Sequence, residues 1–466
     1  MKRFAGVVGA LLCCLSFPAA LGAQPVSDQK TRELEAKIEE LQKKLDALSR
    51  AASEETKRSL DELRGQIEAL SREIETLRTG VPEKTSREGA ASPPVSGLGL
   101  AASRVYRSGQ GVSIGGYGEA LYQNFAERRD DGTASRLSDR VDLLRAVFYF
   151  GYKFDDRFLF NSEIEYEHAT TGEGAEEKGE VSVEFAYLDY LFGKNRSLGV
   201  RAGLVLIPMG FVNELHEPPV FLGANRPEVE QRILPSTWSE LGVGVFGQAG
   251  PLAYRAYVVN GLDAAGFSAR EAIRGGRQAG SSALAENSAV TARVDYVGLP
   301  GVVAGASGYA GGSGQGREVE GRRLRGRVCL FDLHAEWRWR GVQARALYAR
   351  GTIGDAARVN ALSGLTGAGS VPEVFSGAYA EAGYDVLFPR GGDAALLPFL
   401  RYERLRSQQR VPAGFSADAA NDLRLWTIGL QFRPIPQIVV KADYQDFNDR
   451  ARSATDRWNV ALGWLF

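Results

Sequence analysis

The sequence predicts an all-β transmembrane barrel of about 16 antiparallel strands, preceded by an α-helical coiled coil. The first observation is the closing segment, Thr455–Phe466, in which large apolar residues alternate with small or polar ones up to a terminal aromatic residue. The second is an alternation of tight turns and long connections beyond residue 105. The third is a heptad pattern of leucine and isoleucine between residues 34 and 77.

The chain begins with the features of a secretory signal peptide, predicted over residues 1–23. Lys2 and Arg3 precede an apolar stretch at 4–17, and small residues follow at 19–23. The apolar stretch is shorter than the roughly 20 residues that a membrane-spanning helix needs, which disfavours a retained anchor. Since no longer apolar stretch follows, strands must provide any membrane insertion.

Residues 24–80 are predicted to form a periplasmic coiled coil. The apolar positions of its second half are Leu60, Leu63, Ile67, Leu70, Ile74 and Leu77. Charged and polar residues fill the positions between, so only a narrow seam can be buried against partner helices. A charged, marginally ordered tail is the alternative. Residues 81–104 contain proline, glycine and serine without periodicity, which indicates a flexible linker.

The barrel is predicted over residues 105–466. Tight turns are expected at 153–156, 193–196, 249–251, 298–301, 340–341, 389–392 and 434–436. Long connections are expected at 127–138, 170–180, 207–237, 261–287, 312–321, 351–373, 406–421 and 448–454. Outer-membrane barrels have short periplasmic turns and longer external loops, and a soluble sandwich has no reason to follow that rule.

Several predicted strands sort their residues by face. In 329–339, Phe331, Leu333 and Trp337 lie opposite Asp332 and Glu336. Strands that run toward the periplasm end in aromatic residues, which predicts an interfacial girdle. Its members are Phe150, Tyr152, Phe154, Trp337, Trp339, Phe388, Phe432, Trp464 and Phe466. The segments 185–192 and 396–404 do not show a face.

The predicted inward face is highly charged. The lumen residues named here are Arg145, Glu163, Glu165, Arg201, Arg255, Arg338, Arg345, Arg401, Arg433 and Lys441. An interior of this kind cannot be a packed hydrophobic core, so the sequence predicts a hydrated lumen. Because acids accompany the basic residues, we expect a transverse field or local basic clusters rather than an uncompensated basic ring.

The longest connection, 207–237, is the candidate constriction. It combines five prolines with apolar anchors such as Phe211 and Phe221. Long ordered loops in compact domains are usually functional, and a stiff loop folded into the pore could select solutes by charge. Its charged residues are Glu214, His216, Glu217, Arg226, Glu228, Glu230 and Arg232. An external cover or an oligomer contact is the alternative.

Composition and motifs argue against several other classes. The chain has 56 Lys+Arg and 57 Asp+Glu residues, without the basic surplus of a nucleic-acid binder. After signal removal Cys329 is the only cysteine, which excludes an intrachain disulfide. His168, His216 and His334 show no metal-ligand spacing, and the GxGxxG spacing at 242–247 precedes a strand instead of a helix. We expect no catalytic, cofactor or metal site.

At this level of detail the chain resembles porins of the phosphate-selective O/P superfamily, including members with a periplasmic coiled coil. The matching stretches are 115–125 (GGYGEALYQNF), 157–169, 201–214, 226–238 and the terminal NVALGWLF. The resemblance implies a sixteen-stranded homotrimer, a third loop folded into the channel, and Phe466 as a signal for the barrel-assembly machinery. The loop contains no lysine and four glutamates, so the lysine-containing phosphate filter of that superfamily is not matched.

The expected function is therefore a water-filled channel in the cell outer membrane. Small hydrophilic solutes, with anions as one candidate class, would diffuse through it without a catalytic cycle. The alternative is an outer-membrane anchor whose coiled coil binds the cell wall or a periplasmic partner. Removal of residues 28–79 separates the two, because it spares conductance in the first case and abolishes the phenotype in the second.

Overall fold

The computed structural model describes residues 98–171, 179–192 and 197–466. The chain divides into two compact units, Met1–Ser86 and Arg87–Phe466. The predicted signal peptide, the coiled coil and the first part of the linker lie outside the described residues. Within the described part, no helix is both long enough and apolar enough to cross a membrane.

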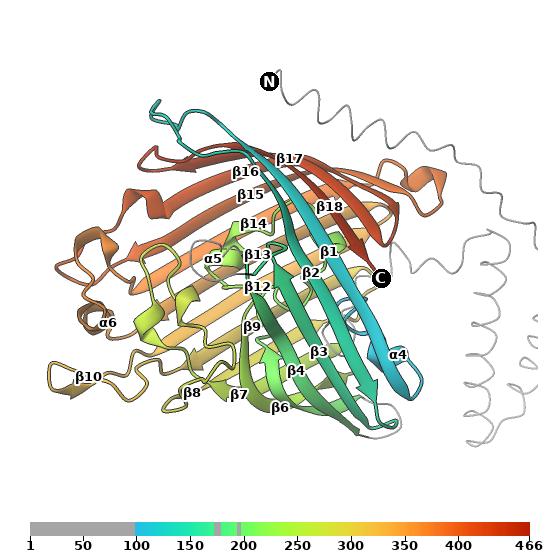
Figure 1. Cartoon of the computed structure of the whole chain (residues 1–466), viewed down its shortest axis with the longest axis horizontal. Coiled ribbons are helices and arrows are strands. Elements are labelled where there is room, and N and C mark those ends of the chain that lie inside the picture. Colours follow the sequence, from blue (N-terminus) through green and yellow to red (C-terminus); the bar gives the residue numbers. More distant parts are fainter. Residues whose placement is uncertain (1–97, 172–178, 193–196) are drawn as a thin grey trace, which may run out of the picture. The chain divides into compact units, whose positions relative to one another are not determined.

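Sixteen antiparallel strands of the described chain form one closed barrel (Figure 1). In chain order they are β1 (Gly111–Phe125), β2 (Arg140–Lys153), β3 (Phe158–Glu167), β4 (Val181–Phe192), β5 (Leu198–Leu206), β6 (Ser239–Ala249), β7 (Leu252–Asn260), β8 (Ser288–Tyr296), β9 (Val302–Gly311), β12 (Val328–Trp339), β13 (Val342–Ile353), β14 (Val374–Tyr384), β15 (Ala395–Arg410), β16 (Asp422–Ile435), β17 (Ile438–Asp449) and β18 (Arg457–Leu465). Successive barrel strands pair with one another, and β18 returns to pair with β1. The predicted barrel and its strand number are confirmed.

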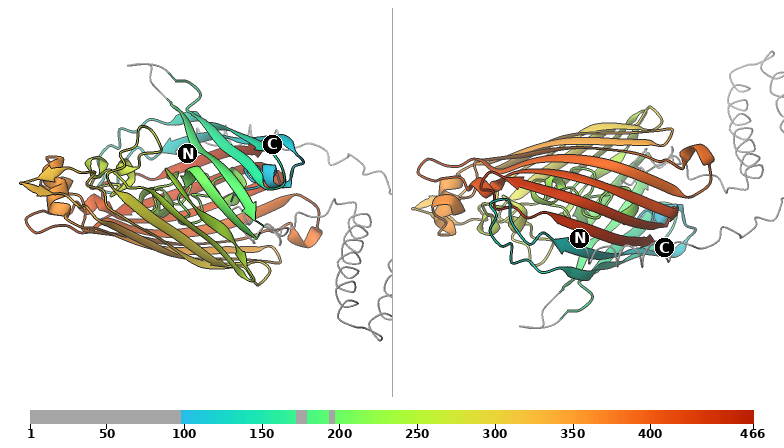
Figure 2. Two further views of the ribbon diagram at one scale, coloured as in Figure 1. Left: turned by 90° about the horizontal axis from the view of Figure 1, so that it is seen from below. Right: turned by 90° about the horizontal axis from the view of Figure 1, so that it is seen from above.

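Shorter elements occupy the connections and the start of the barrel unit. They are α4 (Arg104–Arg107), η3 (Pro218–Val220), α5 (Glu228–Arg232), η4 (Ala264–Gly266), η5 (Arg274–Gly276), β10 (Glu318–Val319), β11 (Arg322–Arg323), α6 (Ala356–Leu362), η6 (Gly367–Gly369), η7 (Phe388–Arg390) and η8 (Ala419–Asn421). The long connections, with α6 and β10, gather at one end of the barrel, and α4 lies at the other end (Figures 1 and 2). The predicted alternation of short and long connections holds for most of the barrel. The exception is the connection after β14, predicted to be a tight turn at 389–392, which spans 385–394 and is longer than the predicted long connection after β17, at 450–456.

Several predicted connections have shifted bounds, and two of the long ones differ most. β15 continues to Arg410, so the connection expected from 406 begins only at 411. The connection after β9 runs to residue 327 and contains the small β10–β11 hairpin, which the sequence pattern did not reveal. The shortest turn, Arg340-Gly341, has positive φ at both residues, the geometry that suits a two-residue hairpin.

The barrel wall has an apolar outer face and a polar inner face. On β12, Leu333 is 54% exposed and Trp337 46%, whereas Asp332 is fully buried. The strand pleat places these two sets on opposite sides of the wall. The outward set matches the apolar belt of a membrane barrel. At the short-turn end, Trp337 and Trp339 stack with ring centroids 6.1 Å apart.

The barrel interior is filled to a degree that the sequence did not predict. A large cluster of buried apolar side chains lies inside the wall and includes Phe211, Trp238, Tyr257 and Phe375. The inward charged groups are paired with one another and with loop backbone, as described below. The predicted hydrated lumen is wrong for these regions, because the connection between β5 and β6 brings its own apolar residues inside.

The predicted flexible linker and the barrel boundary also need correction. Residues 98–104, assigned to the linker 81–104, are largely buried against the inner wall, with Leu98 and Ser103 almost fully covered. A short helix, α4, follows, and β1 starts at Gly111 instead of 105. The pattern was misread because Gly99, Ala101 and Ala102 are small residues, which fit a confined space as well as a linker.

Candidate functional site: the barrel lumen

The connection 207–238, called here the infolded loop, crosses the lumen from the β5–β6 side to the opposite wall. Its backbone N–H groups donate to inward carboxylates on three distant strands. Gly210 donates to Asp332 on β12 at 3.1 Å, and Val229 donates to Glu403 on β15 at 3.0 Å. Ala224 donates to Asp443 on β17 at 2.5 Å. These contacts hold the loop inside the barrel, not above it.

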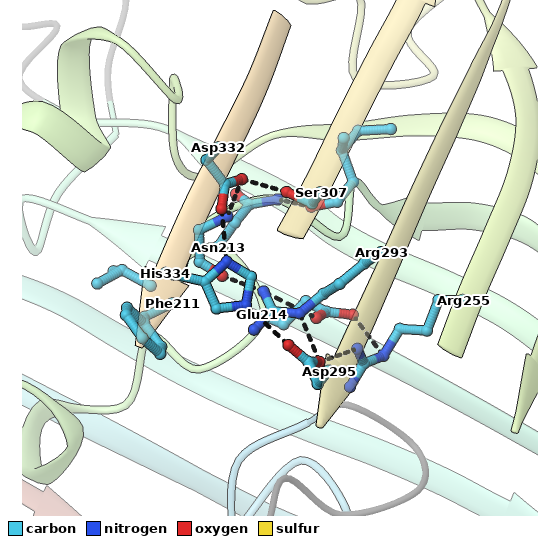
Figure 3. Close-up of polar contacts among 12 residues, drawn as sticks. Phe211, Asn213, Glu214, Arg255, Arg293, Asp295, Ser307, Asp332 and His334 are labelled. Carbon is cyan, nitrogen blue, oxygen red and sulfur yellow. Dashed lines mark hydrogen bonds and ion pairs between the residues drawn. The ribbon is translucent and has the colours of Figure 1, made fainter. Parts of the chain in front are cut away.

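The first anchor of the loop is an ionic network (Figure 3). Glu214 of the loop lies 3.2 Å from Nε of Arg255 on β7. Asp295 on β8 lies 3.2 Å from Nη1 of Arg255 and 2.7 Å from Nε of Arg293. Arg293 also donates to the carbonyl oxygen of Gly210. Two arginines of the wall are therefore shared between a wall carboxylate and the loop.

His334 on β12 extends this network along the inner face of the wall, from β8 to β12. Its Nε2 lies 2.7 Å from Oδ1 of Asp295, and its Nδ1 lies 2.5 Å from Oδ1 of Asp332. The Phe211 ring of the loop meets the imidazole edge to face, with centroids 5.1 Å apart. Both ring nitrogens are engaged, so the imidazole has no lone pair free for a metal. Among the described residues no group of His, Cys, Asp and Glu is arranged to hold a metal ion.

The middle of the infolded loop meets cations of the far wall. The Lys441 ammonium on β17 lies 3.6 Å from the Phe221 ring centroid and donates to the carbonyl oxygen of Gly223 at 2.9 Å. The Arg345 guanidinium on β13 lies 4.6 Å from the Phe211 ring centroid. A cation over an aromatic face gains electrostatic attraction while the ring covers it from water.

Glu230, in α5, braces the loop from within. One carboxylate oxygen accepts the N–H groups of Phe211 at 2.8 Å and Val212 at 2.6 Å, and the other accepts the Tyr379 hydroxyl at 2.5 Å. Burial raises the pKa of Glu230, and these hydrogen bonds only partly offset that effect. Glu230 therefore fixes the loop's shape and is not available to a passing solute.

His216 and Glu217 of the infolded loop contact β3 and the residues that precede β1, respectively. His216 Nε2 lies 2.9 Å from Oε1 of Glu163 on β3. The Glu217 carboxylate accepts backbone N–H groups of Leu100, Ala101 and Ala102 at 3.0, 2.9 and 3.1 Å. Burial raises the pKa of Glu217, and the N–H donors oppose that shift.

Basic side chains concentrate where the infolded loop meets the connection 261–287. Arg274 donates to the carbonyl oxygens of Gln231 and Ser236 at 2.7 and 2.6 Å. Burial, together with repulsion from Arg277, lowers the pKa of Arg274 to about 10. Arg226 donates to the Thr237 hydroxyl at 3.2 Å. Like charges are thus held close together on the long-loop side of the barrel.

The remaining predicted loop residues have less central positions. Arg232 donates to the carbonyl oxygen of Arg270 at 3.2 Å and so links the same two connections. Glu228 is half-buried and lies 3.6 Å from Arg457 on β18. The structure thus brings Glu214 and His216 to the wall and Glu217 to the backbone of residues 100–102, while Arg226 and Arg232 lie where the infolded loop meets the connection 261–287.

The predicted lumen residues all lie on barrel strands at inward positions. Eight of them are at most 8% exposed: Arg145, Glu163, Glu165, Arg201, Arg255, Arg345, Arg401 and Lys441. Arg338 and Arg433 are half-buried. The arginines face carboxylates: Arg145 lies 3.1 Å from Glu165, and Arg401 lies 2.9 Å from Glu403. Most of this charge is locally compensated.

Two residues of the site, His334 and Asn213, were not predicted from the sequence. His334 was considered only as a lone histidine, although the 329–339 pattern placed it on the same face as Asp332 and Glu336. Asn213 was not singled out, yet its side chain closes the base of the loop by bonding Trp238 N at 2.6 Å and the Ile207 carbonyl oxygen at 2.6 Å. No local pattern marks that asparagine.

These observations define a porin-like membrane β-barrel: sixteen strands, an apolar outer belt and a charged interior crossed by one long loop. No family model matches the sequence. An uncharacterized protein of Aquifex aeolicus (strain VF5) is 38% identical over 385 residues, covering 81% of this chain and 85% of the relative. The chain belongs to the same family as that protein.

Solved structures of outer-membrane proteins show likeness at low identity. OmpF of Salmonella typhi, in complex with daunomycin, aligns at 14% identity and TM-score 0.48, covering 78% of this chain and 99% of that chain. The outer-membrane channel DcaP of Acinetobacter baumannii aligns at 12% identity and TM-score 0.47, covering 79% and 100%. Because these TM-scores are below 0.5, the fold is assigned from the strand pairing above.

Proposed function

We propose that the protein is an outer-membrane porin through which small hydrophilic solutes diffuse down their gradient. One observation supports this most directly: the closed barrel has an apolar outer face and a polar inner face on the same strands. A barrel in lipid needs an apolar outer face, and a polar inner face suits an aqueous pathway. The coiled coil at 24–80 would then lie in the periplasm.

The infolded loop is proposed as the constriction of this channel. Glu214 and Glu217 contribute carboxylates, and Arg226 and Arg232 contribute guanidinium groups, while Glu230 holds the shape of the loop. Opposed charges across a narrow pore orient dipolar solutes and sieve them by size. The basic residues gathered on the long-loop side favour entry of anions, since local positive potential raises the local concentration of negative solutes.

Assembly completes the proposal. A homotrimer in outer-membrane lipid is expected from the resemblance to trimeric porins, with Phe466 read by the barrel-assembly machinery. Phe466 lies at the short-turn end, where its backbone bonds Gly116 in both directions, N–H to oxygen at 3.0 Å and oxygen to N–H at 3.1 Å. Its side chain is half exposed, so an assembly factor could contact it.

A second candidate is a membrane anchor that tethers the coiled coil to the envelope. The filled interior favours this anchor hypothesis. The inward charged groups of several strands have almost no exposed surface that a solute could contact. In that case the loop would be a structural core, and transport would play no part.

The test is conductance of the mature chain, refolded and reconstituted in a planar bilayer. Stepwise currents in groups of three are expected for a trimeric pore, and the reversal potential under a salt gradient gives the ion preference. A parallel sample without residues 28–79 should conduct equally. A correctly folded barrel that stays silent at all voltages would reject the porin and leave the anchor.

A further inference from the structure

The described chain begins inside the barrel it later builds. Residues 98–107, called here the N-terminal segment, enter the lumen at the short-turn end and include α4. Val105 packs with Leu159 on β3, Leu191 on β4 and Phe246 on β6. The segment therefore fills space along the inner wall, directly beneath the infolded loop.

Polar contacts hold this segment from opposite sides. From the loop, Glu217 caps three successive backbone N–H groups, those of Leu100, Ala101 and Ala102. From the wall, Asp189 on β4 accepts the Tyr106 hydroxyl, and Arg201 on β5 donates to the same hydroxyl at 2.9 Å. Asn161 on β3 also donates to the carbonyl oxygen of Ala102, at 2.8 Å.

Small residues on both sides make the fit possible. A Cβ added to Gly99 would lie 2.4 Å from the Glu217 carboxyl carbon, and one added to Gly151 on β2 would lie 2.7 Å from Val105 Cβ. A Cβ at Gly151 would force Val105 to shift, and a Cβ at Gly99 would displace the Glu217 carboxylate from the N–H groups that it caps. The wall is shaped around the segment.

The segment covers polar groups of the wall as well as the apolar residues that Val105 meets. Tyr149, Asn161, Tyr187 and Asp189 of the facing wall are at most 3% exposed with the segment in place. Asp189 also has a partner within the wall itself, because it pairs with Arg201 at 2.9 Å. Withdrawal would therefore expose hydroxyl, amide and ion-pair groups that water solvates readily, and its apolar cost would be limited to uncovering the small cluster that Val105 forms with Leu159, Leu191 and Phe246.

We propose that the N-terminal segment is a removable plug of the channel, latched by Glu217 of the infolded loop and by Tyr106 at the wall. The inference rests on the proposed porin function and adds its regulation. Because residue 98 continues directly into the preceding chain, tension on that chain would act on the plug. Release would widen the lumen at the short-turn end and loosen the loop that Glu217 carries.

The first experiment measures release without any current. Val105→Cys is introduced with Cys329→Ser, so that the mature chain has a single buried thiol, and labelling by a water-soluble maleimide is timed. Adding Glu217→Ala should accelerate labelling at least tenfold. The matched control is Glu286→Ala, an exposed glutamate of the connection 261–287, which should leave the rate unchanged.

The second experiment locks the plug. An ideal Cβ at Gly115 on β1 lies 3.7 Å from Ala101 Cβ, within the range of about 3.5–4.5 Å found in disulfides. The pair Ala101→Cys/Gly115→Cys, with Cys329→Ser, should conduct poorly when oxidised and recover several-fold on reduction. Glu217→Ala alone should conduct several-fold more than the unmodified chain, and Ala101→Cys alone should not respond to oxidant.

The outcomes separate the two proposals. If the unmodified chain conducts, and neither labelling nor current responds to Glu217→Ala or to the disulfide, the segment is a fixed part of the wall and the plug is rejected. If Glu217→Ala exposes the introduced thiol at position 105 to maleimide but every variant stays silent in the bilayer, the segment is mobile as proposed and the porin function is rejected. Faster labelling with matching current increases supports both.

Discussion

His216 of the infolded loop and Glu163 of β3 are joined at 2.9 Å inside the barrel, and both are buried. The two residues are 53 positions apart, and the contact ties the loop to the wall next to the N-terminal segment. Because the pair is buried, the position of the loop depends on the charge and hydrogen bonding of the wall residue Glu163.

A double-mutant cycle tests that coupling. His216→Gln and Glu163→Gln should each lower the free energy of unfolding, because each leaves a buried partner unsatisfied. The double variant should lose less than the sum of the two, with a coupling energy of about 0.5–3 kcal/mol. The measurement is the urea midpoint of the refolded barrel. Strict additivity would show that the two residues act independently.

Asp295 faces three basic side chains of the ionic network in Figure 3. Asp295→Asn keeps the shape but removes the charge facing Arg255, Arg293 and His334, so unfolding should become easier by about 3–5 kcal/mol. Glu373→Gln is the control, because Glu373 pairs with Arg410 at the surface, where such pairs contribute about 0–1 kcal/mol. Equal urea midpoints for the two variants would contradict the prediction.

The proposed role of Phe466 as an assembly signal can be tested separately from the packing of its ring. Its ring meets Phe148 edge to face, with centroids 6.2 Å apart. Phe466→Ala should reduce the outer-membrane fraction in cells at least tenfold, while refolding in detergent changes by only about 0.5–1.5 kcal/mol. Phe148→Ala removes the same ring contact and should leave cellular assembly intact. Similar assembly defects in both variants would assign Phe466 to packing alone.

The free-energy cost of an arginine on the outer face is predicted to depend on its depth in the bilayer. Leu333 lies in the middle of β12 and faces outward, so Leu333→Arg should cost about 2–4 kcal/mol in lipid vesicles. Val141→Arg, near the long-loop end of β2, places the same side chain close to the interface and should cost about 0–1 kcal/mol. Folding titrations in urea give both values. An equal cost would place the bilayer elsewhere along the barrel.

The sequence predicted the wall better than the interior. Residues 329–339 alternate strictly because their outward side chains face lipid and their inward ones are charged. The segments 185–192 and 396–404 showed no face because inward Phe185, Tyr187 and Phe399 are apolar, as are outward residues beside them such as Leu188 and Leu400. Those side chains pack on the N-terminal segment and the infolded loop, so their burial depends on contacts that no local period encodes.

The loop contacts illustrate the same limit. Ala224 and Asp443 are separated by 219 positions, and Glu217 meets Ala102 across 115. A chain of prolines and charges indicated that the connection 207–237 was ordered, but not which carboxylates it would meet. The small residues at 99–102 read as a linker because their fit to the wall becomes visible only when the barrel is closed around them.

The pairing of β1 with β18 has a consequence for how the barrel is made. Tyr117 is registered with Leu465, so the first strand of the barrel receives its second partner only from the barrel's final strand. Until then, its open edge could pair with another chain. Closing so long a loop is slow on entropic grounds, which makes the unfinished barrel dependent on factors that hold it apart from its neighbours. Biogenesis, more than final stability, is therefore the stage at which this topology is most vulnerable.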